Sequence, residues 1–182
     1  MNLPNMLTMG RVFLVPVFLL VLFVRVVPEP WGQYLAAAIF ITAALTDGLD
    51  GYIARARRQV SRFGKLMDPL ADKLLVTAAL ISLVALREIG PLPAIIIIGR
   101  EFAVSGLRSL AAAEGIIIAA SRWGKIKTIF QVIAITAILL NNFPFYFINF
   151  PFDQIALWLA VFFTLYSGIE YFIRYRRAFS SE

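Results

Sequence analysis

The sequence predicts an all-α integral membrane bundle of six transmembrane helices with a short N-terminal interfacial helix. Hydrophobic residues make up 60% of the 182 residues and charged residues only 15%, whereas a soluble domain is about 45–50% apolar and about 25% charged. The apolar residues also fall in six runs, each close to the roughly 20 residues that a helix needs to cross a bilayer. These runs lack the alternation of apolar and polar residues that is typical of a membrane barrel.

The order of the elements follows from these runs and from the residues that separate them. The mixed segment 1–10 places Leu3, Met6 and Leu7 on one face, which favours a short helix at the membrane interface. We expect the spanning helices near 11–27, 33–54, 68–86, 91–112, 126–147 and 153–173. The interruptions between them contain Pro28, Pro30, Gly90, Pro91, Pro93, Asn141, Asn142 and Pro144. We find no internal repeat or linker, so residues 1–182 are expected to form a single domain.

The distribution of basic residues predicts the orientation. Of the 17 Lys and Arg residues, only Arg25 and Arg87 fall on the outer side if the N-terminus lies inside, which leaves fifteen on the inner side. Lys and Arg are enriched in cytoplasmic connections. We therefore expect an integral protein of the cytoplasmic membrane of a bacterium, with its N-terminus inside. The net charge of +6 then favours anionic lipid headgroups and phosphorylated substrates as partners, and not nucleic acid.

The chemistry of any site is limited by residue types that the chain lacks. There is no cysteine and no histidine, which excludes disulfides, thiolate nucleophiles, imidazole bases and the usual zinc sites. Proton transfer must therefore use Asp, Glu, Lys or Tyr, and any metal ion must be bound through oxygen.

Four of the eleven acidic residues lie in one stretch of 26 residues, between two apolar runs. Asp47 and Asp50 are three apart, and Asp68 and Asp72 are four apart, so each pair can share a helix face. Carboxylates held together repel unless a cation compensates them, and oxygen ligands favour Mg²⁺, Mn²⁺ or Ca²⁺. Acidic residues inside membrane segments cost about 2.5–3.5 kcal/mol each and usually mark function. The stretch predicts a site for two metal ions and phosphoryl chemistry.

Neighbouring residues support this interpretation. Gly51 and Gly64 permit close approach of a ligand to the backbone, and Arg55 can bind a phosphate through its planar guanidinium group. Two alternatives remain open at this point. Asp68, followed by Pro69, could simply cap a helix, and the carboxylates could instead form the ion path of a divalent-cation transporter.

All eight positions of a long pattern are filled: Asp-x₂-Asp-Gly-x₂-Ala-Arg-x₈-Gly-x₃-Asp-x₃-Asp, at Asp47, Asp50, Gly51, Ala54, Arg55, Gly64, Asp68 and Asp72. The pattern resembles the signature of the CDP-alcohol phosphotransferase family. The resemblance implies a six-helix membrane enzyme, usually a homodimer, that displaces CMP from a CDP-linked donor with an alcohol. It implies two divalent cations, Mg²⁺ or Mn²⁺, bound by Asp47, Asp50, Asp68 and Asp72. It further implies that Asp72 is the general base and that Asp47, Gly51, Arg55 and Gly64 line the CDP pocket.

A second polar constellation lies in the fourth and fifth predicted helices. Glu101, Ser105 and Arg108 follow an i, i+4, i+7 pattern on an otherwise apolar helix. The basic residues of the constellation, Arg100, Arg108, Lys125 and Lys127, could form a pocket for a second phosphate, carried by the acceptor alcohol. The alternative for Arg100 and Arg108 is pairing with Glu101 together with snorkelling to the membrane surface. Lys125 and Lys127 could instead be positive-inside anchors. For Glu170, we expect an ion pair with Arg174 at i+4.

The acceptor is suggested by three further segments, Leu3-Pro4-Asn5 to Arg11, Arg100 to Arg108, and Gly124 to Thr128. These segments resemble the phosphatidylglycerophosphate synthase branch of the family. The resemblance implies that CDP-diacylglycerol and glycerol 3-phosphate give phosphatidylglycerophosphate and CMP. A cardiolipin synthase of the same family, with phosphatidylglycerol as the acceptor, is the alternative.

Overall fold

The computed structural model describes the backbone of residues 3–24, 27–57, 62–113, 115 and 121–175. It describes the side chains of residues 9–24, 27–46, 73–113, 115 and 121–175. The side chains of the acidic stretch therefore lie outside the described residues, although the backbone there is described except at 58–61.

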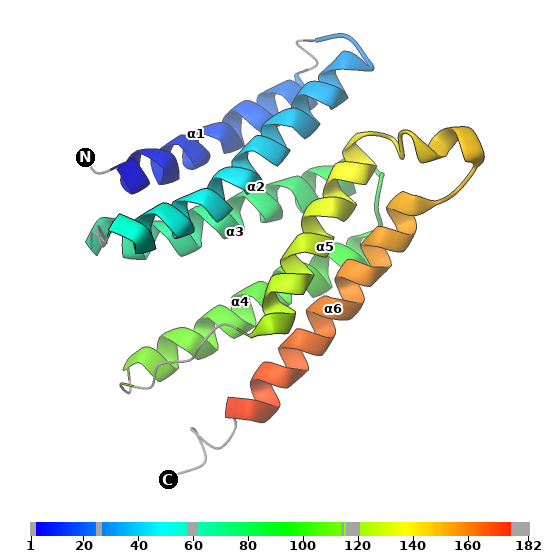
Figure 1. Cartoon of the computed structure of the whole chain (residues 1–182). Coiled ribbons are helices and arrows are strands. Elements are labelled where there is room, and N and C mark those ends of the chain that lie inside the picture. The colour runs from blue at the N-terminus through cyan, green and yellow to red at the C-terminus, as the bar shows by residue number, and fades with distance from the viewer. Residues whose placement is uncertain (1–2, 25–26, 58–61, 114, 116–120, 176–182) are drawn as a thin grey trace.

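The described residues form α-helices and one short 3₁₀ helix, without strands, which confirms the all-α prediction (Figure 1). The helices are α1 (Leu3–Phe23), α2 (Trp31–Arg57), α3 (Arg62–Ala85), α4 (Pro91–Ala113), α5 (Arg122–Leu139), η1 (Phe145–Ile148) and α6 (Phe152–Tyr175). One expectation was wrong, because the leader is not a separate interfacial helix. α1 begins at Leu3 and continues without a break through Pro16 to Phe23, so the apolar run extends the helix of the leader.

The sequence predicted the breaks between the later helices. α4 begins at Pro91, and proline suits the first turn of a helix because its missing N–H has no intrahelical partner there. α5 ends at Leu139, eight residues before the expected end at 147, because Asn141 and Asn142 follow with φ of 52° and 58°. Asparagine adopts this left-handed conformation more readily than most residues, so the chain turns here and reaches α6 through η1.

The helices alternate in direction along the chain and pack around a shared core. α1 contacts α2 and α3, and α5 and α6 pack along each other, while α4 contacts α3 and α6. Phe18 of α1 and Phe40 of α2 are fully buried, with ring centroids 6.3 Å apart. Small buried residues such as Ala36 and Ala79 let the helix backbones approach, as in membrane bundles. Figure 1 shows the ends of α2, α4 and α6 on the same side as the N-terminus, and we call this side the motif end.

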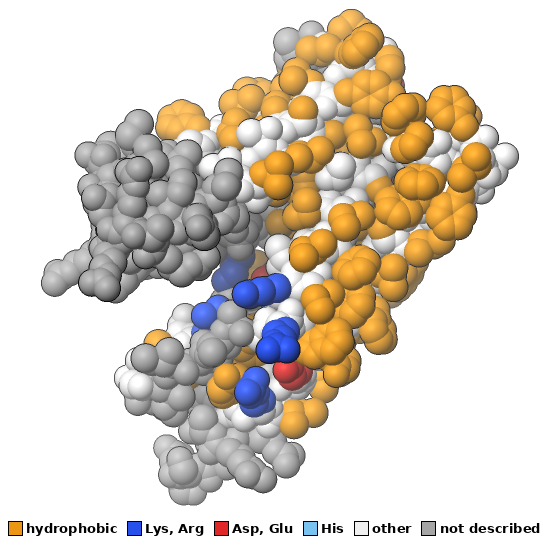
Figure 2. All heavy atoms as spheres, viewed as in Figure 1, with side chains coloured by type: hydrophobic (Ala, Val, Ile, Leu, Met, Phe, Trp, Pro, Cys, Tyr) orange, Lys and Arg blue, Asp and Glu red, His pale blue; other side chains and the backbone are white. Residues whose placement is uncertain are grey.

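The outer surface of the bundle is strongly apolar. Figure 2 shows hydrophobic side chains over most of the described face, and α6 alone exposes Trp158, Phe162, Phe172 and Ile173. Among the residues whose side chains are described, α6 is the helix long and apolar enough to cross a membrane. Shorter apolar helical segments lie at Met9–Phe23, Trp31–Thr46 and Lys73–Ala85.

Candidate active site

The helices carry the acidic motif on neighbouring segments at the motif end. Asp47 and Asp50 lie on α2, Asp68 and Asp72 lie on α3, and these two helices contact each other. The backbone is helical through all four positions, so each pair shares a helix face as the spacing predicted. Asp68 does not cap α3, because that helix begins six residues earlier at Arg62.

The same helices carry the residues predicted for the CDP pocket. Gly51 and Arg55 lie in the last turns of α2, and Gly64 lies in the first turn of α3. Their side chains, like those of the four aspartates, fall outside the described residues. The donor set itself fits a divalent cation, since four carboxylates on two adjoining helices supply only oxygen ligands. Among the residues whose side chains are described, no group of three acidic residues could hold a metal ion.

Glu101 of α4 is the centre of the second constellation. Its Oε1 accepts a hydrogen bond from Lys127 Nζ on α5 and another from Arg100 Nη1 at 3.3 Å. Lys127 is 5% exposed, and a buried ammonium group requires such a partner. The sequence predicted these basic residues as a phosphate pocket, and the structure brings Arg100 and Lys127 together around one carboxylate.

Ser105 joins this group to α3. Its hydroxyl donates to the carbonyl oxygen of Glu101 at 2.7 Å and accepts a hydrogen bond from Lys73 Nζ. Lys73 directly follows Asp72 in the sequence. The polar stripe of α4 is therefore connected to the segment of α3 that carries half of the acidic motif.

Arg100 is held from the opposite side by α6. Its guanidinium carbon lies 5.6 Å from the ring centroid of Tyr171, a favourable cation–π arrangement. The side chain is 9% exposed, and its Nε and Nη2 atoms have no hydrogen-bond partner among the described residues. Gly168 permits this position, because a Cβ atom there would lie 3.1 Å from Arg100 Cγ.

Tyr171 also fixes the start of α5. Its hydroxyl accepts a hydrogen bond from the backbone N–H of Ser121 at 3.0 Å, and the Ser121 hydroxyl accepts one from Gly124 N. Ser121 is thus the N-cap of the helix that carries Lys127. Sequence reasoning missed Tyr171, because an aromatic residue on an apolar helix carries no signal of its partners.

The remaining predicted basic residues are placed differently. Arg108 and Lys125 are exposed, and neither makes a hydrogen bond or ion pair with another described residue. Figure 2 shows Lys and Arg side chains gathered with acidic ones at a hollow in this face. Basic side chains at such a hollow attract anionic ligands.

Glu170 and Arg174 do not form the ion pair that their spacing predicted. No hydrogen bond or salt bridge joins them, and the Oε2 atom of Glu170 is buried without a hydrogen-bond partner among the described residues. The i, i+4 spacing allows this pair but does not determine it.

The chain is similar to known proteins over most of its length. The family described as CDP-alcohol phosphatidyltransferase matches residues 1–166. A Bacillus subtilis protein named CDP-diacylglycerol–glycerol-3-phosphate 3-phosphatidyltransferase is 49% identical, over 94% of this chain and 93% of its own length. Proteins of the same name from Rickettsia bellii and Pseudomonas fluorescens are 38% and 40% identical over 94% of this chain, covering 93% and 88% of their own lengths.

Proposed function

The chain belongs to the CDP-alcohol phosphatidyltransferase family, and from this premise we propose that it transfers the phosphatidyl group of CDP-diacylglycerol to glycerol 3-phosphate. The products are phosphatidylglycerophosphate and CMP. The observation that carries the acceptor assignment is the basic group around Glu101, linked through Ser105 to the α3 segment that carries Asp72. The names of the relatives support the same reaction for those proteins.

The reaction needs one bond made and one broken. A hydroxyl oxygen of glycerol 3-phosphate attacks the lipid-linked phosphorus of CDP-diacylglycerol, and the bond from this phosphorus to CMP breaks. In this proposal Asp72 accepts the hydroxyl proton as the general base, the role that its place in the family signature implies. Asp47, Asp50, Asp68 and Asp72 would hold two divalent cations, Mg²⁺ or Mn²⁺, which neutralise the pyrophosphate and the departing CMP when bound.

The other residues position the two substrates. Gly51, Arg55 and Gly64, together with Asp47, line the CDP pocket of this proposal. Arg100 and Lys127 attract the phosphate of glycerol 3-phosphate, and Glu101 keeps their side chains together. Arg108 and Lys125 add positive charge at the mouth of the pocket, where both are exposed.

The proposal also includes the setting of the enzyme. The six α-helices span the cytoplasmic membrane in a homodimer, and the motif end faces the cytoplasm, where CDP-diacylglycerol and glycerol 3-phosphate enter. The apolar surface supports this placement, as does the excess of Lys and Arg in the connections of one side.

The test is CMP release by purified protein in lipid vesicles with CDP-diacylglycerol and one acceptor at a time. We expect turnover with glycerol 3-phosphate and none above background with phosphatidylglycerol. Turnover with phosphatidylglycerol alone would instead identify a cardiolipin synthase. Uptake of divalent cations without CMP release would contradict both activities.

A further inference from the structure

Arg11 of α1 is buried in the bundle, in the half of its helix nearer the motif end. Its side chain is 2% exposed, although arginine is always charged in proteins. A charge buried to this extent is strongly destabilising unless an opposite charge compensates it. Neither the proposed acceptor group nor the reaction described above uses this residue, so its place in the core needs another explanation.

Few acidic residues could compensate Arg11. α1 packs against α2 and α3. Along these two helices the sequence has only the acidic residues of the motif, Asp47, Asp50, Asp68 and Asp72. Glu29 lies beyond the end of α1 at Phe23, which is twelve residues or about 18 Å of helix from Arg11. A carboxylate that reaches Arg11 from a neighbouring helix therefore belongs to the acidic motif.

The register of α1 against α2 identifies one of these residues. Phe18 of α1 lies against Phe40 of α2, with ring centroids 6.3 Å apart. The two helices run in opposite directions (Figure 1). Positions seven residues before Phe18 and seven residues after Phe40 therefore lie at the same level, about 10 Å from this contact. Those positions are Arg11 and Asp47.

Positions 11 and 47 also lie on the two helix faces that meet at this contact. Seven residues are almost two full turns of helix, so Arg11 shares a face with Phe18, and position 47 shares a face with Phe40. The buried residues of these faces have the same spacing, and they are Arg11, Val15, Phe18 and Leu22 on α1 and Ala36, Phe40 and Ala43 on α2. The backbone thus places Arg11 and position 47 opposite each other across the α1–α2 interface.

We propose that Arg11 is a positioning residue of the metal site, which pairs with Asp47 and holds its carboxylate in place. This role rests on the proposed function, because it treats Asp47 as a metal ligand. A carboxylate has two oxygens, so one can bind a cation while the other accepts hydrogen bonds from a guanidinium group. Partners of this kind orient metal ligands, and their loss weakens metal binding about 10–100-fold. Arg11 also compensates one of the four negative charges before metal binds.

The first test is a double-mutant cycle on thermal unfolding in detergent with a chelator, followed by tryptophan fluorescence. In the parent protein Asp47→Asn should lower the unfolding temperature by about 10 °C, because Arg11 stays buried without its carboxylate. In the Arg11→Met background the same change should raise the temperature, because it then only relieves repulsion among the aspartates. An equal shift in both backgrounds would overturn the proposal.

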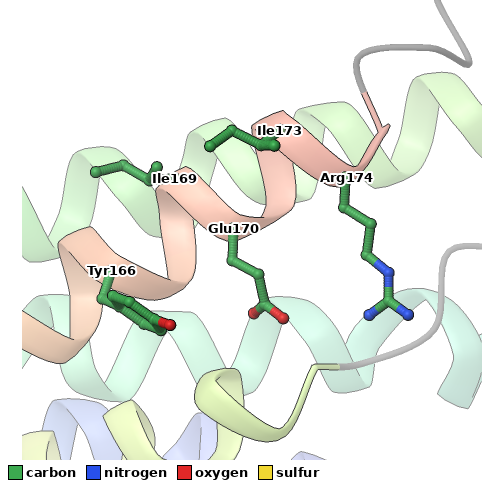
Figure 3. A pocket seen from close by; sticks show the side chains of 5 residues that line it. All are labelled: Tyr166, Ile169, Glu170, Ile173 and Arg174. Atoms are coloured by element: carbon green, nitrogen blue, oxygen red, sulfur yellow. The ribbon is translucent and has the colours of Figure 1, made fainter.

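Two controls separate this pair from general effects of charge. Asp68→Asn, on α3, should shift the unfolding temperature equally with and without Arg11. Arg174→Met removes an exposed arginine of α6, which extends from the helix beside a hollow (Figure 3), and it should leave the effect of Asp47→Asn unchanged. A reversal of sign with Asp68→Asn instead of Asp47→Asn would overturn the assignment of the partner.

Metal affinity is a second measurement that does not depend on the double variant. Free Mn²⁺ is measured by electron paramagnetic resonance during titration of the parent protein, Arg11→Met and Arg11→Lys. We expect the Kd to rise about tenfold in Arg11→Met and less in Arg11→Lys, which keeps the charge but loses the planar guanidinium group. An unchanged Kd in both variants would overturn the proposal, and so would tighter binding by Arg11→Met.

The two measurements also separate this role from the transfer reaction. Neither uses CMP release, so a protein that binds Mn²⁺ and shows the reversal of sign would keep the role of Arg11 even without phosphatidyl transfer. A parent protein that binds no Mn²⁺ would remove the metal site from the proposed function, and the positioning role of Arg11 with it.

Discussion

Gly168 of α6 lies so close to Arg100 of α4 that an added methyl group would be 3.1 Å from Arg100 Cγ. The absence of a side chain at this one position lets the arginine lie between Glu101 and the ring of Tyr171. A helix that binds only lipid on this face would not need a glycine here, and glycine lowers helix stability by about 0.5–1 kcal/mol relative to alanine.

The first prediction is that Gly168→Ala raises the KM for glycerol 3-phosphate severalfold and changes kcat less. The methyl group must displace Arg100, which moves a phosphate-binding group but no catalytic one. Initial rates of CMP release at varied acceptor concentration measure this. Gly106→Ala is the matched control, because no described atom lies within 4 Å of a Cβ there. The same KM in both variants would contradict the proposed role of Arg100.

The second prediction concerns the ion pair of Glu101 with the buried Lys127. Removing one partner of a buried ion pair costs about 3–5 kcal/mol, because the other charge remains without compensation. Glu101→Gln should therefore lower the thermal unfolding temperature in detergent markedly. The double variant Glu101→Gln/Lys127→Met should recover part of the loss, since it removes the buried charge. The unfolding temperature of Lys127→Met alone is the reference. If Lys127→Met lowers it as much in the Glu101→Gln background as in the parent protein, the two residues are not coupled.

The sequence predicted the helices well where their ends depend on local chemistry. Proline at Pro91 and the two asparagines after α5 set boundaries that follow from the conformations of those residues alone. The start of α3 was misplaced because Asp68 and Pro69 together have the pattern of a helix start, although α3 already begins at Arg62. A capping pattern shows that a residue could begin a helix. Asp68 does not begin α3, because a helical turn already precedes it.

The partners of the polar residues were harder to predict. Lys73 and Ser105 are 32 residues apart, and Ser121 and Tyr171 are 50 apart. Their contacts depend on how α3, α4, α5 and α6 cross, and spacing within one helix does not determine this. Glu170 illustrates the same limit, because its spacing to Arg174 allowed an ion pair that the packed helices do not form.

The third prediction separates two contacts of Tyr171, its hydrogen bond from Ser121 N–H and its ring beside Arg100. Tyr171→Phe removes the acceptor for Ser121 N–H but keeps the ring beside Arg100, so about 1–3 kcal/mol of stability is lost through the unsatisfied buried donor. Tyr171→Leu removes the ring as well. We expect both variants to unfold at lower temperature, and only Tyr171→Leu to raise the KM for glycerol 3-phosphate. A raised KM in Tyr171→Phe as well would place the effect at the start of α5 and not at Arg100.

The fourth prediction is that Asp72→Asn lowers CMP release by at least about a hundredfold, since general base catalysis contributes about 10²–10⁴. Asparagine is nearly the same size and keeps the helix, so the thermal unfolding temperature should change little. Asp153→Asn, in the first turn of α6 at the other side of the bundle, is the control and should retain activity. Full activity of the Asp72 variant would remove this residue from the mechanism.

The fifth prediction is loss of CMP release when divalent cations are removed. Four carboxylates on α2 and α3 repel one another without a cation, and an uncompensated pyrophosphate is poorly stabilised as CMP departs. A chelator should abolish turnover, and an excess of Mg²⁺ or Mn²⁺ should restore it. Turnover that continues after complete chelation would show that the reaction does not need cations at the carboxylates. Arg55 and the basic group around Glu101 would then have to balance the charge of the phosphates.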